Sequence, residues 1–239
     1  MRTTRLGAFL ASLAITTVTA AVLTTGPAVA KADTPVRVGL SLGGLTKVVQ
    51  PYRTFLGAFS GSVSYTASDS STAAVTDGDS VLQRKLPGKP WRDVKTDHDA
   101  VPGALDFGTY GSHATGNTLY RVHYLGGTDG TTTWAPAFSN TVSVITLWAI
   151  RDTSACIPHT KRCHISGTLR PTTKHHKIVL QVKRGTTWKK LQTVHSDARG
   201  RYSVTVIATR TKTLYRVVIA RTKHIRATAY AYQVKLRVG

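Results

Sequence analysis

The chain has 239 residues, a formal charge of +21 and 41% hydrophobic residues, a share that supports packed cores. All 11 acidic residues are Asp, and the absence of Glu removes both a good helix former and the commonest general acid with a raised pKa. Because Thr, Val and Tyr favour strands and Gly favours turns, the composition predicts an all-β fold and argues against an enzyme.

Residues 1–32 have the organisation of a secretory signal peptide. Two arginines precede an uncharged apolar stretch, and small residues at positions 28–32 suit signal peptidase. An uncleaved membrane anchor is the alternative, which the Thr and Gly content of the stretch disfavours. The remaining sequence has no second apolar run of about 20 residues. We therefore expect an extracellular protein, secreted or associated with the cell wall, with no membrane span after cleavage.

Residues 33–149 read as short alternating strands between turns, which predicts a β-sandwich. Two places in it could carry chemistry. The segment 107–117 reads as an inserted loop, and an enzyme or inhibitor working there would need a concave pocket with convergent polar groups. Its Gly content favours a flexible loop instead. Residues 97–99 (Asp-His-Asp) alternate between opposite faces of a strand, so we interpret them as a solvated strand end.

Residues 150–164 are expected to be a linker with a loop closed by Cys156 and Cys163. Outside the cell, two thiols seven positions apart are most simply a disulfide. His159 and His164 lie nearby, so the alternative is a zinc site formed by the two cysteines and these two histidines. The spacing of the four residues matches no common zinc pattern, and export favours oxidation of the thiols to a disulfide. We expect no metal and no other cofactor.

Residues 165–239 predict a second, strongly basic β-sandwich. Three strands show clear alternation: residues 178, 180 and 182, then 202, 204 and 206, then 215, 217 and 219 are apolar. Together with the first sandwich, this gives two tandem antiparallel β-sandwich domains after a signal peptide.

The two halves repeat one pattern. Val81-Leu82-Gln83, Trp91 and Thr118-Leu119-Tyr120-Arg121-Val122 match Val179-Leu180-Gln181, Trp188 and Thr213-Leu214-Tyr215-Arg216-Val217. With Ser166-Gly167-Thr168-Leu169 and Asp197-Ala198-Arg199-Gly200, this pattern resembles the Ig-like or fibronectin-III-like β-sandwich repeats of secreted actinobacterial proteins. The resemblance implies two tandem Ig-like antiparallel β-sandwich domains and an extracellular setting. Such repeats act as spacers, adhesion modules or surface-binding modules. The resemblance supplies no catalytic residues.

The repeated aromatic residues have two possible roles. An exposed pair, Trp91 and Trp188, could stack on sugar rings, but a repeated Trp in a strand is usually a core or turn-packing residue, which is the interpretation we adopt. Tyr120 and Tyr215 are interpreted as structural residues near the start of a late strand.

Positive charge is concentrated in the second half. Residues 33–152 carry 10 Lys or Arg and 10 Asp, whereas residues 153–239 carry 19 Lys or Arg and a single Asp, a formal charge of +18. Such a division places any polyanion on the second sandwich. The candidate binding residues are Lys174, His175, His176, Lys177, Lys183, Arg184, Lys189, Lys190, Arg199, Arg201, Arg210, Lys212, Arg221, Lys223 and Arg226.

The sequence therefore predicts a non-enzymatic protein that adheres through its basic second sandwich to an anionic polymer of the cell envelope or to an acidic glycan. Net charge of this size also gives nonspecific attraction to nucleic acid. The alternative is a purely structural spacer whose basic surface has no specific ligand.

Overall fold

The computed structural model describes residues 33–98, 103–110, 113–157, 160–209 and 212–234. The proposed signal peptide, residues 1–32, lies outside the described residues. The described part of the chain contains strands and turns and no helix, so the predicted all-β class is confirmed. Consistent with this, it includes no apolar helix of membrane-spanning length.

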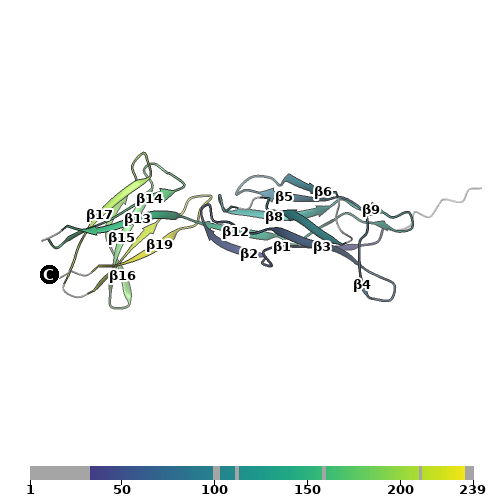
Figure 1. Cartoon of the computed structure of the whole chain (residues 1–239), viewed down its shortest axis with the longest axis horizontal. Helices are drawn as coiled ribbons and strands as arrows, with labels where there is room; N and C mark the ends of the chain where they lie inside the picture. The colour runs from purple at the N-terminus through teal and green to yellow at the C-terminus, as the bar shows by residue number, and fades with distance from the viewer. Residues whose placement is uncertain (1–32, 99–102, 111–112, 158–159, 210–211, 235–239) are drawn as a thin grey trace, which may run out of the picture. The chain divides into compact units, whose positions relative to one another are not determined.

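The first β-sandwich has two main sheets (Figure 1). One consists of β1 (Val36–Leu42), β3 (Phe59–Thr66), β4 (Thr72–Ala74) and β7 (Ala104–Gly108). The other has the order β2-β12-β8-β5-β6, with β11 beside β8. Its strands are β2 (Lys47–Pro51), β5 (Ser80–Lys85), β6 (Arg92–Asp97), β8 (Thr118–Tyr124), β11 (Ala137–Phe138) and β12 (Val142–Leu147). A short hairpin joins β9 (Gly127–Thr128) to β10 (Thr133–Trp134).

The core of the first sandwich follows from the period-two pattern of its strands. In β8, Tyr120, Val122 and Tyr124 are buried, and they alternate with Arg121 and His123. Residues from the facing strands, including Phe59 and Phe107, complete one continuous cluster. The strands pair in antiparallel register except β2 and β12, which run parallel.

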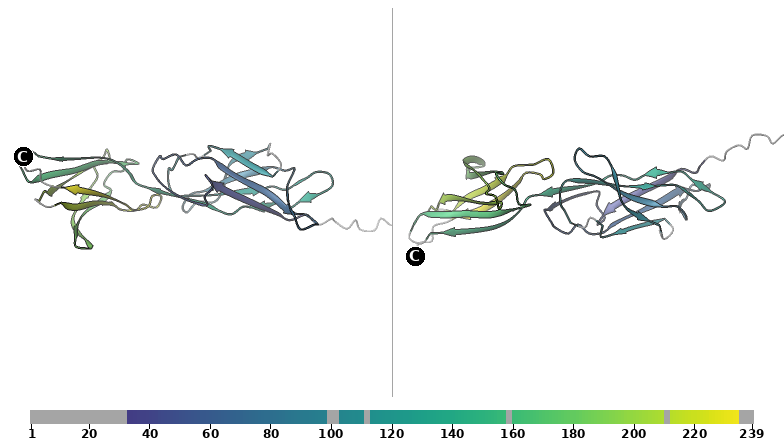
Figure 2. Two further views of the ribbon diagram at one scale, coloured as in Figure 1. Left: turned by 60° about the horizontal axis from the view of Figure 1, so that its bottom comes forward. Right: turned by 90° about the horizontal axis from the view of Figure 1, so that it is seen from above.

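The second β-sandwich has a three-stranded sheet and a four-stranded sheet (Figure 2). The first has the order β13-β14-β17, with β13 (Ala149–Cys156), β14 (Arg162–Arg170) and β17 (Arg201–Ile207). The second has the order β16-β15-β18-β19, with β15 (Lys177–Arg184), β16 (Thr187–His195), β18 (Thr213–Ile219) and β19 (Thr228–Val234). All pairs are antiparallel.

The predicted alternation in the second sandwich is confirmed. Residues 178, 180 and 182 of β15, 202, 204 and 206 of β17, and 215, 217 and 219 of β18 are all buried in one core. Their polar neighbours point away from it, which leaves the charged side chains of these strands exposed or half-buried.

The predicted linker is different in the structure. Residues 149–156 form β13, which pairs residue by residue with β14 from Ala149–Arg170 to Cys156–Cys163. The second sandwich therefore begins before residue 150, and Trp148 is already fully buried in its core. The prediction missed this strand because its sequence, Arg-Asp-Thr-Ser-Ala, has no apolar alternation, and it is fixed by pairing with β14 instead.

Candidate functional site

Three loops meet at one end of the second sandwich, which we call the loop end: residues 171–176, 196–200 and 220–227. The buried Ser196 ties two of them together, because its hydroxyl donates to the carbonyl of Thr173 and accepts from the backbone N–H of His176 at 3.0 Å. The N–H of Ala220 donates to the carbonyl of Lys177 at 3.2 Å, which holds the third loop beside the first. The loop end is therefore a fixed scaffold for the charges that it carries.

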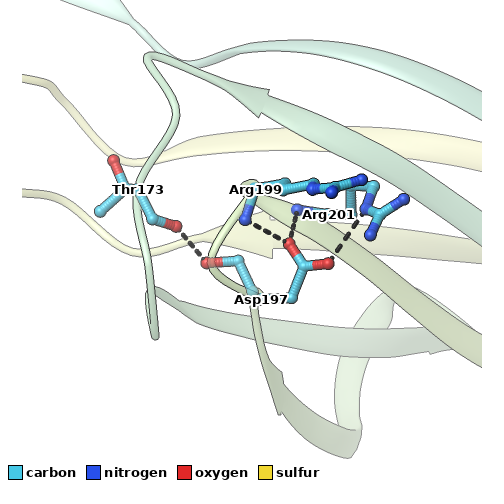
Figure 3. Close-up of polar contacts among 5 residues, drawn as sticks. Thr173, Asp197, Arg199 and Arg201 are labelled. Atoms are coloured by element: carbon cyan, nitrogen blue, oxygen red, sulfur yellow. Dashed lines mark hydrogen bonds and ion pairs between the residues drawn. The ribbon is translucent and has the colours of Figure 1, made fainter.

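Asp197 organises the turn before β17 (Figure 3). Its Oδ1 accepts from the backbone N–H groups of Arg199 and Arg201, both at 2.8 Å, and its Oδ2 lies 3.0 Å from Nε of Arg201. The hydrogen bond from the Arg201 backbone is the main reason why the pKa of Asp197 lies below its ordinary value. An ionised Asp197 therefore offsets the charge of Arg201, while the Arg199 side chain has no such partner within the described residues.

Most of the predicted binding residues at the loop end, or in the first strand residue beside it, are exposed. They are Lys174, His175, Lys177, Arg199, Arg201, Arg221, Lys223 and Arg226. His176 is different: its ring packs at a tilt against Trp148 with centroids 4.5 Å apart, and its Nε2 lies 2.8 Å from the carbonyl oxygen of Ala220. This half-buried imidazole covers the core, and its role in binding stays a prediction.

The β15–β16 hairpin does not bring its four cations to one surface. Lys183 and Lys190 pair with Trp188 and Gln181 on the outer face of the sheet. Arg184 and Lys189 alternate with these two lysines along the strands, so their side chains project from the opposite face of the sheet. Neighbouring positions in a hairpin do not share a surface, because the period of two sends successive side chains to opposite faces of the sheet.

Two predicted residues are not at the loop end. Lys212 is exposed just before β18, toward the opposite end of the sandwich. Arg210 lies outside the described residues.

The structure adds an arginine that the sequence analysis left out. Arg216, on β18, lies on the outer face, where its guanidinium carbon is 4.4 Å from the centroid of the Trp188 ring. Its Nε donates to Oε1 of Gln181 at 2.6 Å. Trp188 is therefore a half-buried packing residue that lies against an arginine, and it does not belong to the core. The repeated Gln, Trp and Tyr-Arg positions were the signal that could have identified this contact.

The first sandwich contains the same three residues in the same arrangement. Arg121 lies with its guanidinium carbon 4.3 Å from the Trp91 centroid, and its Nε donates to Oε1 of Gln83 at 2.9 Å. Both hairpins also have a β-bulge at the same place, after Leu82 and after Leu180. The sequence repeat is thus explained by a shared cation–π contact on the outer face as well as by the shared core.

Two residues beside this contact differ between the copies: Phe138 and Asp93 of the first copy correspond to Ala229 and Lys190 of the second. In the first copy Phe138 covers the other side of the Arg121 guanidinium at 3.9 Å, and Asp93 accepts from the Gln83 amide at 2.7 Å. Burial lowers the pKa of Arg121. In the second copy Lys190 stands opposite Gln181, where Asp93 stands opposite Gln83.

The other candidates in the first sandwich are structural. Phe107 and Ala114 are fully buried, and the backbone of Ala114 exchanges hydrogen bonds with Arg53 and Thr54. In its described residues, the segment 107–117 is therefore anchored at both ends. Nδ1 of His98 lies 3.0 Å from Oδ1 of Asp79, and both side chains are exposed.

The interpretation of the repeated tyrosines is confirmed. The Tyr215 hydroxyl donates to the carbonyl of Ile207 at 2.9 Å, and the Tyr120 ring packs on Phe59 with centroids 4.6 Å apart. Both side chains are buried, so they stabilise the two cores.

Cys156 and Cys163 form a disulfide with an S–S distance of 2.05 Å. The predicted pairing is confirmed, and the bonded sulfurs are not available as the two thiolates of the alternative zinc site. Among the described residues, no group of three or more His, Cys, Asp or Glu side chains could hold a metal ion.

Comparison with known proteins gives structural likeness alone. No family model matches the chain, and no curated protein matches it. A two-domain fibronectin type III segment of chicken tenascin is 11% identical, with a TM-score of 0.46 over 84% of this chain and all of that one. A tetra-tandem repeat from the extending region of a large adhesion protein is 13% identical, with a TM-score of 0.37; the match covers 84% of this chain and 49% of that one. The Yersinia pseudotuberculosis adhesin InvE is 12% identical, with a TM-score of 0.33 over 84% and 59% of the two chains. Likenesses at this level say nothing about the ligands or partners of this chain.

Proposed function

We propose that this chain is a secreted, non-enzymatic protein of two β-sandwiches that adheres to an anionic polymer outside the cell through its second sandwich. One observation carries the proposal. Among the described Lys and Arg residues of the second sandwich, only Arg201 has a carboxylate within ion-pair distance. The other cations face solvent without an internal counter-charge, which is the condition for attracting a polyanion.

The arrangement of these cations supports the same function. The loop end holds exposed cations on three loops that are joined by hydrogen bonds, so a polymer with repeated negative charges can contact several of them together. The first sandwich carries balanced charge and serves as a spacer or partner surface. The disulfide fits the oxidising setting outside the cell.

The polymer is an anionic component of the cell envelope or an acidic glycan. The test is retention of residues 33–239 on purified Gram-positive cell wall, before and after removal of the anionic polymers, across a salt series. We expect removal to abolish retention, and we expect affinity to fall steeply as salt rises. Retention that is unchanged by removal would contradict the proposal. Equal, weak retention on any anionic matrix would favour the structural spacer.

A further inference from the structure

The outer face of the sheet β16-β15-β18-β19 holds an arginine that is fixed in place and open on one side. Arg216 is oriented by the hydrogen bond from its Nε to Gln181 and by stacking on Trp188. A guanidinium has five N–H donors, and this arrangement uses one of them. Within the described residues, the two terminal amino groups of Arg216 have no hydrogen-bond partner. The side chain is therefore held ready for an acceptor that the described residues do not supply.

Two lysines share this face with Arg216. Lys190 stands directly opposite Gln181, and Lys183 stands directly opposite Trp188. Directly opposed side chains in an antiparallel pair have Cβ atoms about 5 Å apart, so long side chains at these positions reach one another. Both lysines are exposed and have no carboxylate partner among the described residues. Three positive charges thus surround one half-buried indole.

The first sandwich shows how the same contact looks when it is closed. There, Trp91 and Phe138 cover the two faces of the Arg121 guanidinium, and Asp93 supplies a negative charge beside it. Phe138 stands opposite His123, two residues after the arginine. At the equivalent place in the second sandwich, Ala229 stands opposite Val218.

The exchange of a phenyl ring for a methyl group leaves Arg216 with one aromatic ring against it among the described residues, where Arg121 has two. The exchange of Asp93 for Lys190 reverses the neighbouring charge. Because both copies keep the Trp, Arg and Gln residues, these differences are local and not a consequence of the fold.

We propose that Arg216, Lys183 and Lys190 form a binding site for a phosphate group of the anionic polymer. The site rests on the proposed function and locates its most specific contact. The terminal amino groups of an arginine can donate to two oxygens of one anion, and a tetrahedral phosphate still offers further oxygens to the lysines. A carboxylate has two oxygens and one negative charge, so it offers the lysines fewer acceptor sites than a tetrahedral phosphate does.

The test uses residues 33–239 and short-chain inorganic polyphosphate at fixed ionic strength. We expect Arg216→Gln to lower the affinity about tenfold or more, because it removes charge-assisted bonds to the anion. Arg199→Gln removes one exposed charge at the loop end and should lower it less than about threefold. Ala229→Phe keeps the net charge and copies the ring of the first sandwich, so it should lower the affinity by covering Arg216.

These variants separate the site from the general function. Equal losses for Arg216→Gln and Arg199→Gln, with no effect of Ala229→Phe, would overturn the site and leave general adhesion through charge intact. Failure of the unaltered protein to bind polyphosphate, or any anionic cell-wall polymer, would overturn both. Tighter binding to polyglutamate than to polyphosphate of equal charge would overturn the assignment to phosphate. Lys190→Asp, at an exposed position, gives a second variant if Arg216→Gln does not fold, and it should lower the affinity at least as much.

Discussion

Single residues fix the start of the second sandwich. Trp148 lies between β12 and β13 in the sequence and is fully buried. Its indole N–H donates to the carbonyl of Ala220 at 2.9 Å, its own carbonyl accepts from the hydroxyl of Tyr230, and its ring packs against His176. One side chain thus joins the first strand of the sandwich to the loop end, where most of the exposed cations lie.

We expect Trp148→Ala to destabilise the second sandwich by about 3–5 kcal/mol, because it leaves a large cavity and removes the hydrogen bond from the indole to Ala220. Chemical denaturation would measure this loss, and amide hydrogen exchange in β15 and β18 would show that it belongs to the second sandwich. Ile207→Ala is the control: this side chain is 62% exposed, so we expect a change within about 0.5 kcal/mol. Equal effects of the two substitutions would contradict the role assigned to Trp148.

A second prediction at this scale concerns alkaline pH. Tyr124 is 1% exposed and donates to the carbonyl of Asp77 at 2.6 Å, and burial raises its pKa to about 12. An unfolded tyrosine ionises near pH 10. The contribution of Tyr124 to stability is therefore complete below about pH 10 and is lost as pH rises through about 12.

Absorbance titration near 295 nm should show a tyrosine class that ionises well above pH 10, and Tyr124→Phe should remove part of it. Tyr202 in the second sandwich, whose pKa burial also raises to about 12, remains as an internal reference. If the substitution leaves the high-pH part of the titration unchanged, Tyr124 ionises normally and its assigned burial is wrong.

At the scale of elements, the β13–β14 hairpin shows how a short covalent loop secures a strand of weak sequence. Cys156 and Cys163 are directly opposed at the end of a ladder of eight residue pairs. The β13 sequence has little apolar material in its outer half, so pairing with β14 and the disulfide together hold it.

We expect the double substitution Cys156→Ser and Cys163→Ser to lower the free energy of unfolding of the second sandwich by about 2.5 kcal/mol, the chain-entropy value for a loop of this length. Urea denaturation of the two forms measures the difference, and hydrogen exchange should show β13 opening before β14. Unchanged stability would show that strand pairing alone holds the hairpin.

The sequence predicted the elements whose side chains alternate clearly, and it failed where a contact depends on partners far along the chain. The alternation at Ile178, Leu180 and Val182 was enough to assign both the strand and its buried face. The stacking of Arg216 on Trp188 depends on the register of three strands and on a bulge, which single-strand patterns do not contain. His176 was read as a surface charge because its contact with Trp148 joins residues that are 28 positions apart.

At the scale of the whole molecule, one fold was used twice with different surfaces. The two sandwiches share the hairpin bulge, the Gln, Trp and Arg contact and the tyrosine of the late strand. They differ in charge: residues 33–152 carry 10 Lys or Arg and 10 Asp, whereas residues 153–239 carry 19 Lys or Arg and one Asp. Because both copies fold around equivalent cores, this charge difference is not required by the architecture. It is the feature on which the proposed adhesion depends.

The most direct measurement compares two variants with equal loss of charge. In one, Lys174, Lys177, Arg199 and Lys223 of the second sandwich are changed to Gln; in the other, Arg37, Lys47, Lys89 and Arg92 of the first sandwich are changed. All eight side chains are exposed. For binding to purified cell wall across a salt series, we expect the second-sandwich variant to lose at least about tenfold in affinity and to show a shallower salt dependence, while the first-sandwich variant changes little. Equal losses in the two variants would contradict the account, because binding would then follow total charge and not the second sandwich.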